Sequence, residues 1–471
     1  MVRFLFLILI GSLISIHADA QKADLIIFNA NIHTLSKKQP KAEAVAISGS
    51  RIFAVGSTAA IKKLSGEATV FIDAAGSLVI PGFNDSHVHF LPLGNTFSTL
   101  NAADIISSES LTKQLRKYSM VLPKRRWILG SGLKFEPTEA EFLAIDKAAF
   151  ENPLLIFFDG GKRALVNHVA AQGKARLIEG KELEIIRRSI PKDHTSNWLG
   201  IAETATNYAA SIGVTSIQEM SSDDRREVYR QLEKDGKLKT RVYDCSALGK
   251  SLNKDTANDT EMVRGGCRKG FWEGDETRIA ELTNDVLSAD KAGLQVMIHA
   301  MGREANSMIL SIFEKTARSN GKRDRRFRIE HANGVDEAGR KLFGKIPVIA
   351  SVQPHLFRSA NDQFLEFFNA GVDIAFGSDA AMTDMDPLLA ISDAVNLSGG
   401  KITVEQAVSA YTAGSAYAEF QENVKGTIEV GKYADLVILS DDIFTMSSSK
   451  ISDAHVDVTI VGGKIVYKRT D

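Results

Sequence analysis

Short runs of apolar and β-branched residues occur at both ends of the chain. Residues 24–32, 44–47 and 51–55 form such runs near the start, and residues 434–439 and 456–461 form them near the end. Short runs of this composition, bounded by Gly, Ser, Asn and Asp, are typical of strands. We expect the strands of the two ends to pair with each other in one small β-sandwich domain.

The middle of the chain follows a different pattern. Apolar Ile279, Leu282 and Val286 have helical spacing within residues 276–292, and the apolar run at 294–299 predicts a strand after that helix. Further predicted strands at 327–330, 348–352 and 373–376 alternate with predicted helices at 305–318, 337–342 and 362–369. This α/β alternation predicts a parallel sheet, and over this length it favours a (β/α)8 barrel of the TIM type. A doubly wound open sheet is the competing topology.

The start of the chain predicts a secretory signal peptide. Arg3 precedes an apolar run at 4–16, and small residues leading to Ala20 form a pattern typical of a cleavage site. The run is shorter than the roughly 20 residues that cross a bilayer. We therefore expect an exported protein, periplasmic or secreted, with no membrane span after cleavage.

The length indicates more than one domain, because the chain has 471 residues and single cores stop growing near about 250–300. The patterns predict four segments. They are a signal peptide at 1–20, a first part of the sandwich at 21–80, the barrel at 81–424 and a second part of the sandwich at 425–471.

The net charge and the number of cysteines argue against some classes of function. Lys and Arg total 57 and Asp and Glu total 58, a net charge of −1, without the basic excess that nucleic-acid binding requires. We expect a small molecule as the partner, and homo-oligomerisation stays open. Cys245 and Cys267 are too few for a disulfide framework or a zinc finger. We expect two buried free thiols, with a disulfide between them as the alternative in an oxidising compartment.

Four histidines and one aspartate stand where predicted strands end. His87 and His89 are two residues apart, so on a strand their imidazoles share one face and suit one metal ion. His299, His331 and Asp379 each end a later predicted strand. Each residue taken alone is as readily a packing residue or a helix cap. In a barrel, however, strand ends converge on one rim, so together the five predict an active site.

Longer motifs surround these residues. They are Pro-Gly-Phe-Asn-Asp-Ser-His-Val-His at 81–89, Lys-Gly-Phe-Trp-Glu-Gly at 269–274, His-Ala-Met-Gly at 299–302, Glu-His at 330–331, Gln-Pro-His at 353–355, Gly-Ser-Asp at 377–379 and the tail at 426–439. With them the sequence resembles the amidohydrolase superfamily of metal-dependent hydrolases, and within it the branch that includes N-substituted formamide deformylase. The resemblance implies a barrel with a composite β-sandwich made from both chain ends.

The resemblance also implies a metal centre. His87 and His89 would hold one metal ion, and His299 and His331 a second. Lys269 would bridge them after carboxylation by CO2, because a free ammonium has no lone pair whereas a carbamate offers two oxygens. Zinc is the default ion for such a site, with one or two per chain. A solvated loop lysine, and with it a mononuclear site, is the alternative for Lys269.

The implied reaction is hydrolysis. Metal ions lower the pKa of water, so hydroxide is available near neutral pH. Asp379 would accept the proton and return it to the leaving nitrogen. We expect cleavage of a non-peptide or N-acyl C–N bond, of the amide or formamide type. Lactone or ester hydrolysis by the same centre, and a catalytically inactive exported binding protein, are the alternatives.

The sequence departs from the family pattern around the site. Lys162 stands where the family often has a His, and a cation there would favour an acidic substrate group. Arg303 and Glu304 displace by one position a carboxylate that could orient a ligand. The loop after residues 269–274 is short, which predicts a more open pocket. His355 is expected to face the substrate, or else to pack below the rim.

Overall fold

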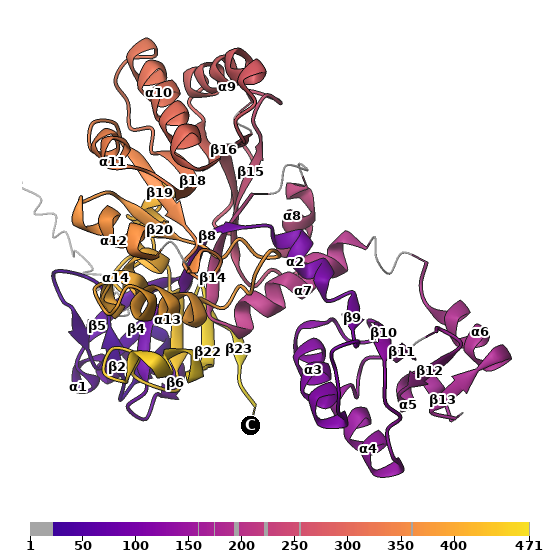
Figure 1. The fold of residues 1–471 in the computed structure, drawn as a ribbon. Helices are drawn as coiled ribbons and strands as arrows, with labels where there is room; N and C mark the ends of the chain where they lie inside the picture. Colours follow the sequence, from indigo (N-terminus) through magenta and orange to yellow (C-terminus); the bar gives the residue numbers. More distant parts are fainter. Residues whose placement is uncertain are drawn as a thin grey trace, which may run out of the picture.

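The computed structural model describes residues 22–158, 160–173, 175–192, 197–220, 225–253, 256–358 and 361–470. The predicted signal peptide at 1–20 lies outside these residues. Among the described helices, none combines the length and the apolar character that crossing a bilayer requires. The strands of the described residues form four sheets, and Figure 1 shows their arrangement.

The largest sheet is a barrel of eight parallel strands. In order around the sheet they are β8 (Phe83–Val88), β14 (Val214–Glu219), β15 (Arg241–Ala247), β16 (Val263–Trp272), β17 (Gln295–Met301), β18 (Phe327–Asn333), β19 (Val348–Val352) and β20 (Ile374–Phe376). The barrel is nearly closed, because Asp379 N donates to His87 O at 2.7 Å just beyond β20. The predicted TIM-like barrel is confirmed, and the open doubly wound sheet is excluded.

Helices follow the barrel strands, as the sequence pattern predicts. They are α7 (Trp198–Ser211) before β14, then α8 (Arg226–Lys234), α9 (Ile279–Lys291), α10 (Arg303–Ser319), α11 (Glu337–Phe343), α12 (Asn361–Asn369) and α13 (Pro387–Leu397). A short 3-10 turn, η2 (Glu276–Arg278), precedes α9. The chain then runs through α14 (Val404–Ser409), a π-helical turn η4 (Ala410–Gly414) and α15 (Ser415–Ala418).

Side chains alternate along β18 between an apolar outer face and a polar face inside the barrel. On β18, Phe327 and Ile329 belong to the main hydrophobic core. Arg328 and Glu330 alternate with them and are 0% exposed. Alternation with a period of two is the geometry of a strand, so the polar side chains of β18 gather inside the barrel.

The two chain ends meet in the β-rich part beside the barrel. The first sheet holds β5 (Arg51–Gly56), β4 (Ala44–Ser48), β1 (Ala23–Phe28) and β6 (Ser65–Asp73). The second holds β23 (Lys464–Lys468), β22 (Val456–Val461), β21 (Leu436–Leu439), β7 (Leu78–Pro81), β2 (Asn31–His33) and β3 (Lys41–Ala42). Short helices α1 (Thr58–Ile61), η1 (Lys62–Leu64) and η5 (Ser448–Asp453) complete it. Because β7 and β21 pair antiparallel, both ends contribute to one sheet, as predicted.

A further five-stranded sheet interrupts the barrel after its first strand. It contains β9 (Thr99–Asn101), β10 (Ile128–Leu133), β11 (Leu154–Phe158), β12 (Arg163–Val166) and β13 (Leu177–Glu179). Helices α3 (Ser108–Val121), α4 (Glu139–Ala148), α5 (His168–Ala171) and α6 (Gly180–Ser189) accompany it. In Figure 1 this lobe projects away from the barrel, to which α2 (Phe90–Thr96) and α7 connect it. The sequence patterns did not separate this lobe from the barrel.

Close packing of α2 on α7 anchors the lobe. A Cβ added at Gly94 of α2 would lie only 2.3 Å from the carbonyl oxygen of Ile201 on α7. Only a residue without a side chain allows this approach. The base of the lobe is therefore fixed against the end of β8.

The cysteines correct one prediction. Cys245 on β15 and Cys267 on β16 form a disulfide, so the expected pair of free thiols is wrong. The parallel register places these two residues opposite each other, with Cα atoms 4.8 Å apart. That register arises from the barrel and is not visible in two strands read separately.

We predict that this disulfide contributes about 3 kcal/mol to the free energy of unfolding, the order expected when a cross-link closes a loop of this size. The two cysteines are 22 residues apart in sequence. Urea unfolding of oxidised protein, compared with protein refolded under reductant, measures the difference. Two titratable thiols in the denatured, unreduced chain would contradict the disulfide.

Candidate metal centre

The barrel brings the predicted histidines and aspartate to its carboxyl-terminal end. His87 lies at the end of β8, and His89 follows it at the start of α2. His299 lies in β17, His331 in β18, and Asp379 just beyond β20. The structure therefore collects residues from four strands and spread over almost 300 positions into one place, as the alternating pattern predicts.

Three of these residues bring one potential ligand atom each close together. One nitrogen of His87, one nitrogen of His331 and one carboxylate oxygen of Asp379 all lie within 4.8 Å of one another, and all three residues are buried. Asp379 Oδ1 is 3.2 Å from His87 Nε2 and 3.4 Å from His89 Nε2. Asp379 thus faces both histidines of the His-x-His motif.

Side chains on the opposite ring nitrogens orient two of the histidines. His87 Nδ1 is 2.6 Å from Glu330 Oε2, and His331 Nδ1 is 2.7 Å from Gln353 Oε1. Both contacts occupy Nδ1, so Nε2 of each ring remains for a ligand contact. Hydrogen bonding of the second ring nitrogen is how proteins fix the orientation and tautomer of a metal-binding histidine.

His299 completes the cluster through ring contacts. Its ring centroid is 4.5 Å from that of His331 in an edge-on arrangement. On its other side it stacks on Phe271, with centroids 5.1 Å apart. Phe271 is half exposed, so an aromatic ring forms part of the rim beside His299.

Lys269 lies on β16 (Val263–Trp272), beside the histidine cluster. Its side chain is buried, and its Nζ makes no hydrogen bond. The ammonium lies 3.8 Å above the Phe271 ring. Burial lowers the pKa of Lys269 to about 8, against the opposing influence of the Glu330 and Asp379 carboxylates. A buried lysine without a partner is uncommon and points to a function for its nitrogen.

Burial and neighbouring charges set the ionisation of the imidazoles. Burial lowers the pKa of His89 and of His299 to about 4, and that of His331 to about 3. These three rings are therefore neutral at neutral pH, which is the form that binds metal. His87 differs: burial opposes its charged form, but Glu330 and Asp379 outweigh it and raise its pKa.

The pKa values of the two carboxylates, Glu330 and Asp379, are also lowered, but neighbouring charges cause this and burial opposes it. Burial favours their neutral form. The Arg328 guanidinium and His87 nevertheless hold the pKa of Glu330 well below its usual range. The hydrogen bond and charge of His87 likewise lower the pKa of Asp379. Both carboxylates are therefore ionised at neutral pH.

Two residues of the candidate metal centre have an unusual backbone conformation. His331 has φ 73° and Asp379 has φ 60°, both in the left-handed region that non-glycine residues rarely adopt. Such strain costs of order 1–3 kcal/mol and is typical of functional positions. At Gly377, an added Cβ would lie 2.5 Å from His87 N, so glycine is needed where the last strand meets the first.

The two predicted substrate-binding residues have different surroundings. His355 Nδ1 lies 2.6 Å from Asp393 Oδ2, which ties its ring to helix α13. Lys162 lies in the exposed turn between β11 and β12, in the projecting lobe. No described contact joins Lys162 to the histidines, so the structure does not bring it together with the others.

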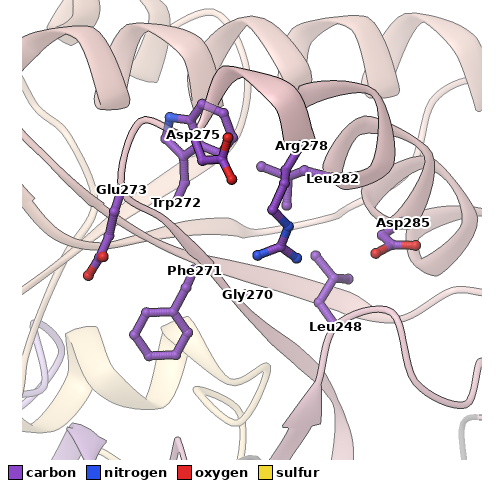
Figure 2. A pocket seen from close by; sticks show the side chains of 9 residues that line it. All are labelled: Leu248, Gly270, Phe271, Trp272, Glu273, Asp275, Arg278, Leu282 and Asp285. Atoms are coloured by element: carbon purple, nitrogen blue, oxygen red, sulfur yellow. The ribbon is translucent and has the colours of Figure 1, made fainter.

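A cavity of about 400 Å³ opens beside the cluster, at the end of β16. Figure 2 shows its lining, with Arg278 at the centre of the view, Asp285 at one side and Glu273 at the other. Phe271 belongs to both the cavity wall and the His299 stack. The Glu273 carboxylate also acts on the ionisation of His299. The cavity is therefore next to the cluster rather than built from it.

Comparison with known proteins identifies the family. The model of the amidohydrolase family matches residues 70–467, which is most of the chain. The chain belongs to the amidohydrolase family. It is 29% identical to Protein LONG AFTER FAR-RED 3 of Arabidopsis thaliana, covering 94% of this chain and 92% of that protein. It is 23% identical to N-substituted formamide deformylase of Arthrobacter pascens, covering 96% and 99%.

Solved structures share the fold of this amidohydrolase. An uncharacterised metal-dependent hydrolase from Pyrococcus horikoshii superposes with a TM-score of 0.61 at 22% identity, covering 90% of this chain and 99% of that one. An adenosine deaminase from Xanthomonas campestris with bound zinc gives a TM-score of 0.58 at 17% identity, covering 94% and 93%. These likenesses establish the architecture.

The residues of this amidohydrolase fit the divalent metal ion that the family implies. Two imidazoles and a carboxylate present ligand atoms within 4.8 Å of one another, and these are donors that zinc prefers. The buried Lys269 Nζ without a hydrogen bond lies among the same groups. The donor set and the unpartnered amine are thus consistent with a metal centre.

Sequence reasoning quoted two important residues only as parts of motifs. Glu330 and Gln353 contact the ring nitrogens of His87 and His331. Glu330 and His87 are 243 positions apart, so no local pattern links them. The aromatic neighbour Phe271 was also passed over, although its spacing of two from Lys269 on a strand was a usable signal.

We predict that His331→Ala weakens zinc binding by about 100-fold or more, because one donor of a small set is lost. Titration of chelator-treated protein with zinc against a competing indicator measures the affinity. His455→Ala is the matched control, since His455 is a half-exposed surface residue paired with Asp457. Equal affinities for wild type and His331→Ala would exclude His331 as a ligand.

Proposed function

We propose that this amidohydrolase is a metal-dependent hydrolase of a non-peptide or N-acyl C–N bond, of the amide or formamide type. The observation that carries the proposal is the close approach of His87, His331 and Asp379, whose ligand atoms lie within 4.8 Å of one another. The similarity to N-substituted formamide deformylase over nearly the whole of both chains supports the choice of bond. Metal-activated hydroxide would be the attacking group.

The ligands follow the family arrangement in this proposal. His87 and His89 would hold one metal ion, His299 and His331 would hold a second, and zinc would be the ion for such donors. Lys269 would be the ligand shared by the two ions after carboxylation, in which its neutral amine adds to CO2 and releases one proton. The burial of Lys269 and its lack of a partner support this, because the neutral amine forms readily there.

In this proposal, Asp379 transfers the protons of the reaction. A bound divalent ion would supply acidity to water and polarise the scissile carbonyl. Asp379 is ionised and faces the two histidines of β8 and α2. It accepts the proton of the attacking water and later returns it to the leaving nitrogen, which departs poorly unless protonated.

Substrate recognition involves residues around this centre. His355 has Nδ1 tied to Asp393, so its Nε2 is the nitrogen left for a substrate group. Lys162 stays our candidate for a contact with an acidic substrate group, made from the lobe rather than from the rim. Phe271 offers an aromatic surface beside His299.

Export is part of the proposal. The first twenty residues have the pattern of a signal peptide. The disulfide between Cys245 and Cys267 supports an oxidising location, because cytosolic proteins rarely keep such bonds. A periplasmic or secreted protein satisfies both observations.

The reaction class is tested with substrate pairs. Purified protein supplied with zinc and bicarbonate is assayed on N-formyl and N-acyl amines and on esters and lactones matched to them. Turnover of the amides supports the proposal. Turnover of the esters alone indicates an esterase or lactonase, and no turnover with no metal uptake indicates a binding protein.

Replacement of Asp379 by Asn should lower kcat by about 10²–10⁴-fold, the usual contribution of general acid–base catalysis. Zinc content measured on the same preparation separates this loss from a loss of metal. Turnover near that of wild type would exclude the assigned role of Asp379.

We expect a carbamate carbon signal in the ¹³C NMR spectrum of protein loaded with zinc and ¹³C-bicarbonate. Because the neutral amine reacts and the pKa of Lys269 is lowered to about 8, uptake should be faster above about pH 8 than about two units below it. Lys269→Met should abolish the signal. Lys425→Met is the control, since Lys425 is a buried lysine paired with Glu419 at 2.7 Å. A signal that persists in Lys269→Met contradicts the assignment.

A further inference from the structure

The His87–Glu330 contact belongs to a buried charge network inside the barrel. Glu330 is 0% exposed and its Oε2 lies 2.6 Å from His87 Nδ1. Arg328, two residues earlier on β18, is also 0% exposed and its Nε is 2.9 Å from Glu330 Oε1. The three groups form a chain from the barrel interior to the metal centre.

We propose that Glu330, held by Arg328, is the positioning residue of His87, fixing its ring so that Nε2 faces Asp379 and the candidate metal centre. This inference rests on the proposed metal centre. It assigns to Glu330 a role that acts through His87 and not on the substrate.

Arg328 is itself held from several strands. Its guanidinium donates to Ser86 O on β8 at 2.6 Å and to Ser351 Oγ on β19 at 3.0 Å. It also contacts Gln218 on β14. A guanidinium fixed by these partners cannot swing away from Glu330, so the carboxylate that faces His87 is fixed as well.

The chemistry of the pair determines which ring nitrogen is left for the metal ion. A carboxylate paired with a guanidinium accepts hydrogen bonds and does not donate them. His87 Nδ1 must therefore carry the hydrogen in this contact, and Nε2 is directed to Asp379, 3.2 Å away. Carboxylate partners of this kind orient metal-binding histidines and raise their strength as ligands.

The contact of His331 shows what is particular to Glu330. Gln353 accepts from His331 in the same geometry, at 2.7 Å, but it is neutral and lacks a guanidinium partner among its described contacts. Of these two contacts, the one to His87 therefore combines orientation of the ring with a full negative charge. We expect the ligand strength of His87 to depend on that charge.

The test is zinc affinity of the full-length, chelator-treated protein, by competition with an indicator. Glu330→Gln keeps the size of the side chain and removes its charge, and should bind zinc 10–100-fold more weakly, the usual effect of losing such a partner. Glu419→Gln is the matched control. Glu419 is a buried carboxylate in an ion pair with Lys425, and it touches none of the proposed ligands. This control should bind zinc like wild type.

The outcomes separate this inference from the proposed function. Wild type that binds no zinc overturns both. Wild type that binds zinc, with Glu330→Gln equal to it or with Glu419→Gln equally weakened, overturns the inference alone. Weakening confined to Glu330→Gln supports it.

A second measurement needs no change at position 330. In zinc-loaded wild type with ¹⁵N-labelled histidine, long-range ¹⁵N–¹H correlation should show a hydrogen on His87 Nδ1, the assignment coming from loss of the signal in His87→Ala. Metal coordination through Nδ1, with the hydrogen on Nε2, would overturn the inference even if Glu330→Gln fails to fold.

Discussion

Backbone hydrogen bonds between β8 and the segment after β20 are the constraint on which the site depends. Asp379 N donates to His87 O, and His89 N donates to Ala380 O at 2.5 Å. Strands that are almost 300 residues apart in sequence thereby become neighbours. Gly377 permits the approach, since any side chain there would collide with His87. Without this closure, the carboxylate of Asp379 would not face the His-x-His motif.

Closure of the barrel also creates the interior in which charge can be buried. Arg328 and Glu330 are fully buried, an arrangement whose desolvation cost is large unless each charge is paired. The Arg328 guanidinium contacts residues of β8, β14 and β19. These contacts form only when the three strands are in register with β18. The polar interior therefore links the ordering of the barrel to the orientation of His87.

The surroundings of the centre come from β16 and from the lobe inserted after β8. Phe271 stacks on His299 and bounds a cavity that carries Glu273, Asp285 and Arg278. The lobe inserted after β8 projects from the barrel and carries Lys162 in an exposed turn. In the proposed function, the centre and the recognition of the substrate would depend on different parts of the chain.

The sequence by itself favoured the barrel over a doubly wound sheet, and it indicated the pairing of the chain ends and the order of His87, His89, His299, His331 and Asp379, because these depend on local periodicity and on strand ends. Tertiary structure decided which of them meet. The contacts of His87 with Glu330 and of Cys245 with Cys267 depend on register between separate strands. The sequence did not predict a separate lobe at 99–190, because the short strands there resemble those of the barrel. A local pattern indicates which face of its strand a residue lies on. Which residue of another strand it contacts is decided only when the barrel closes.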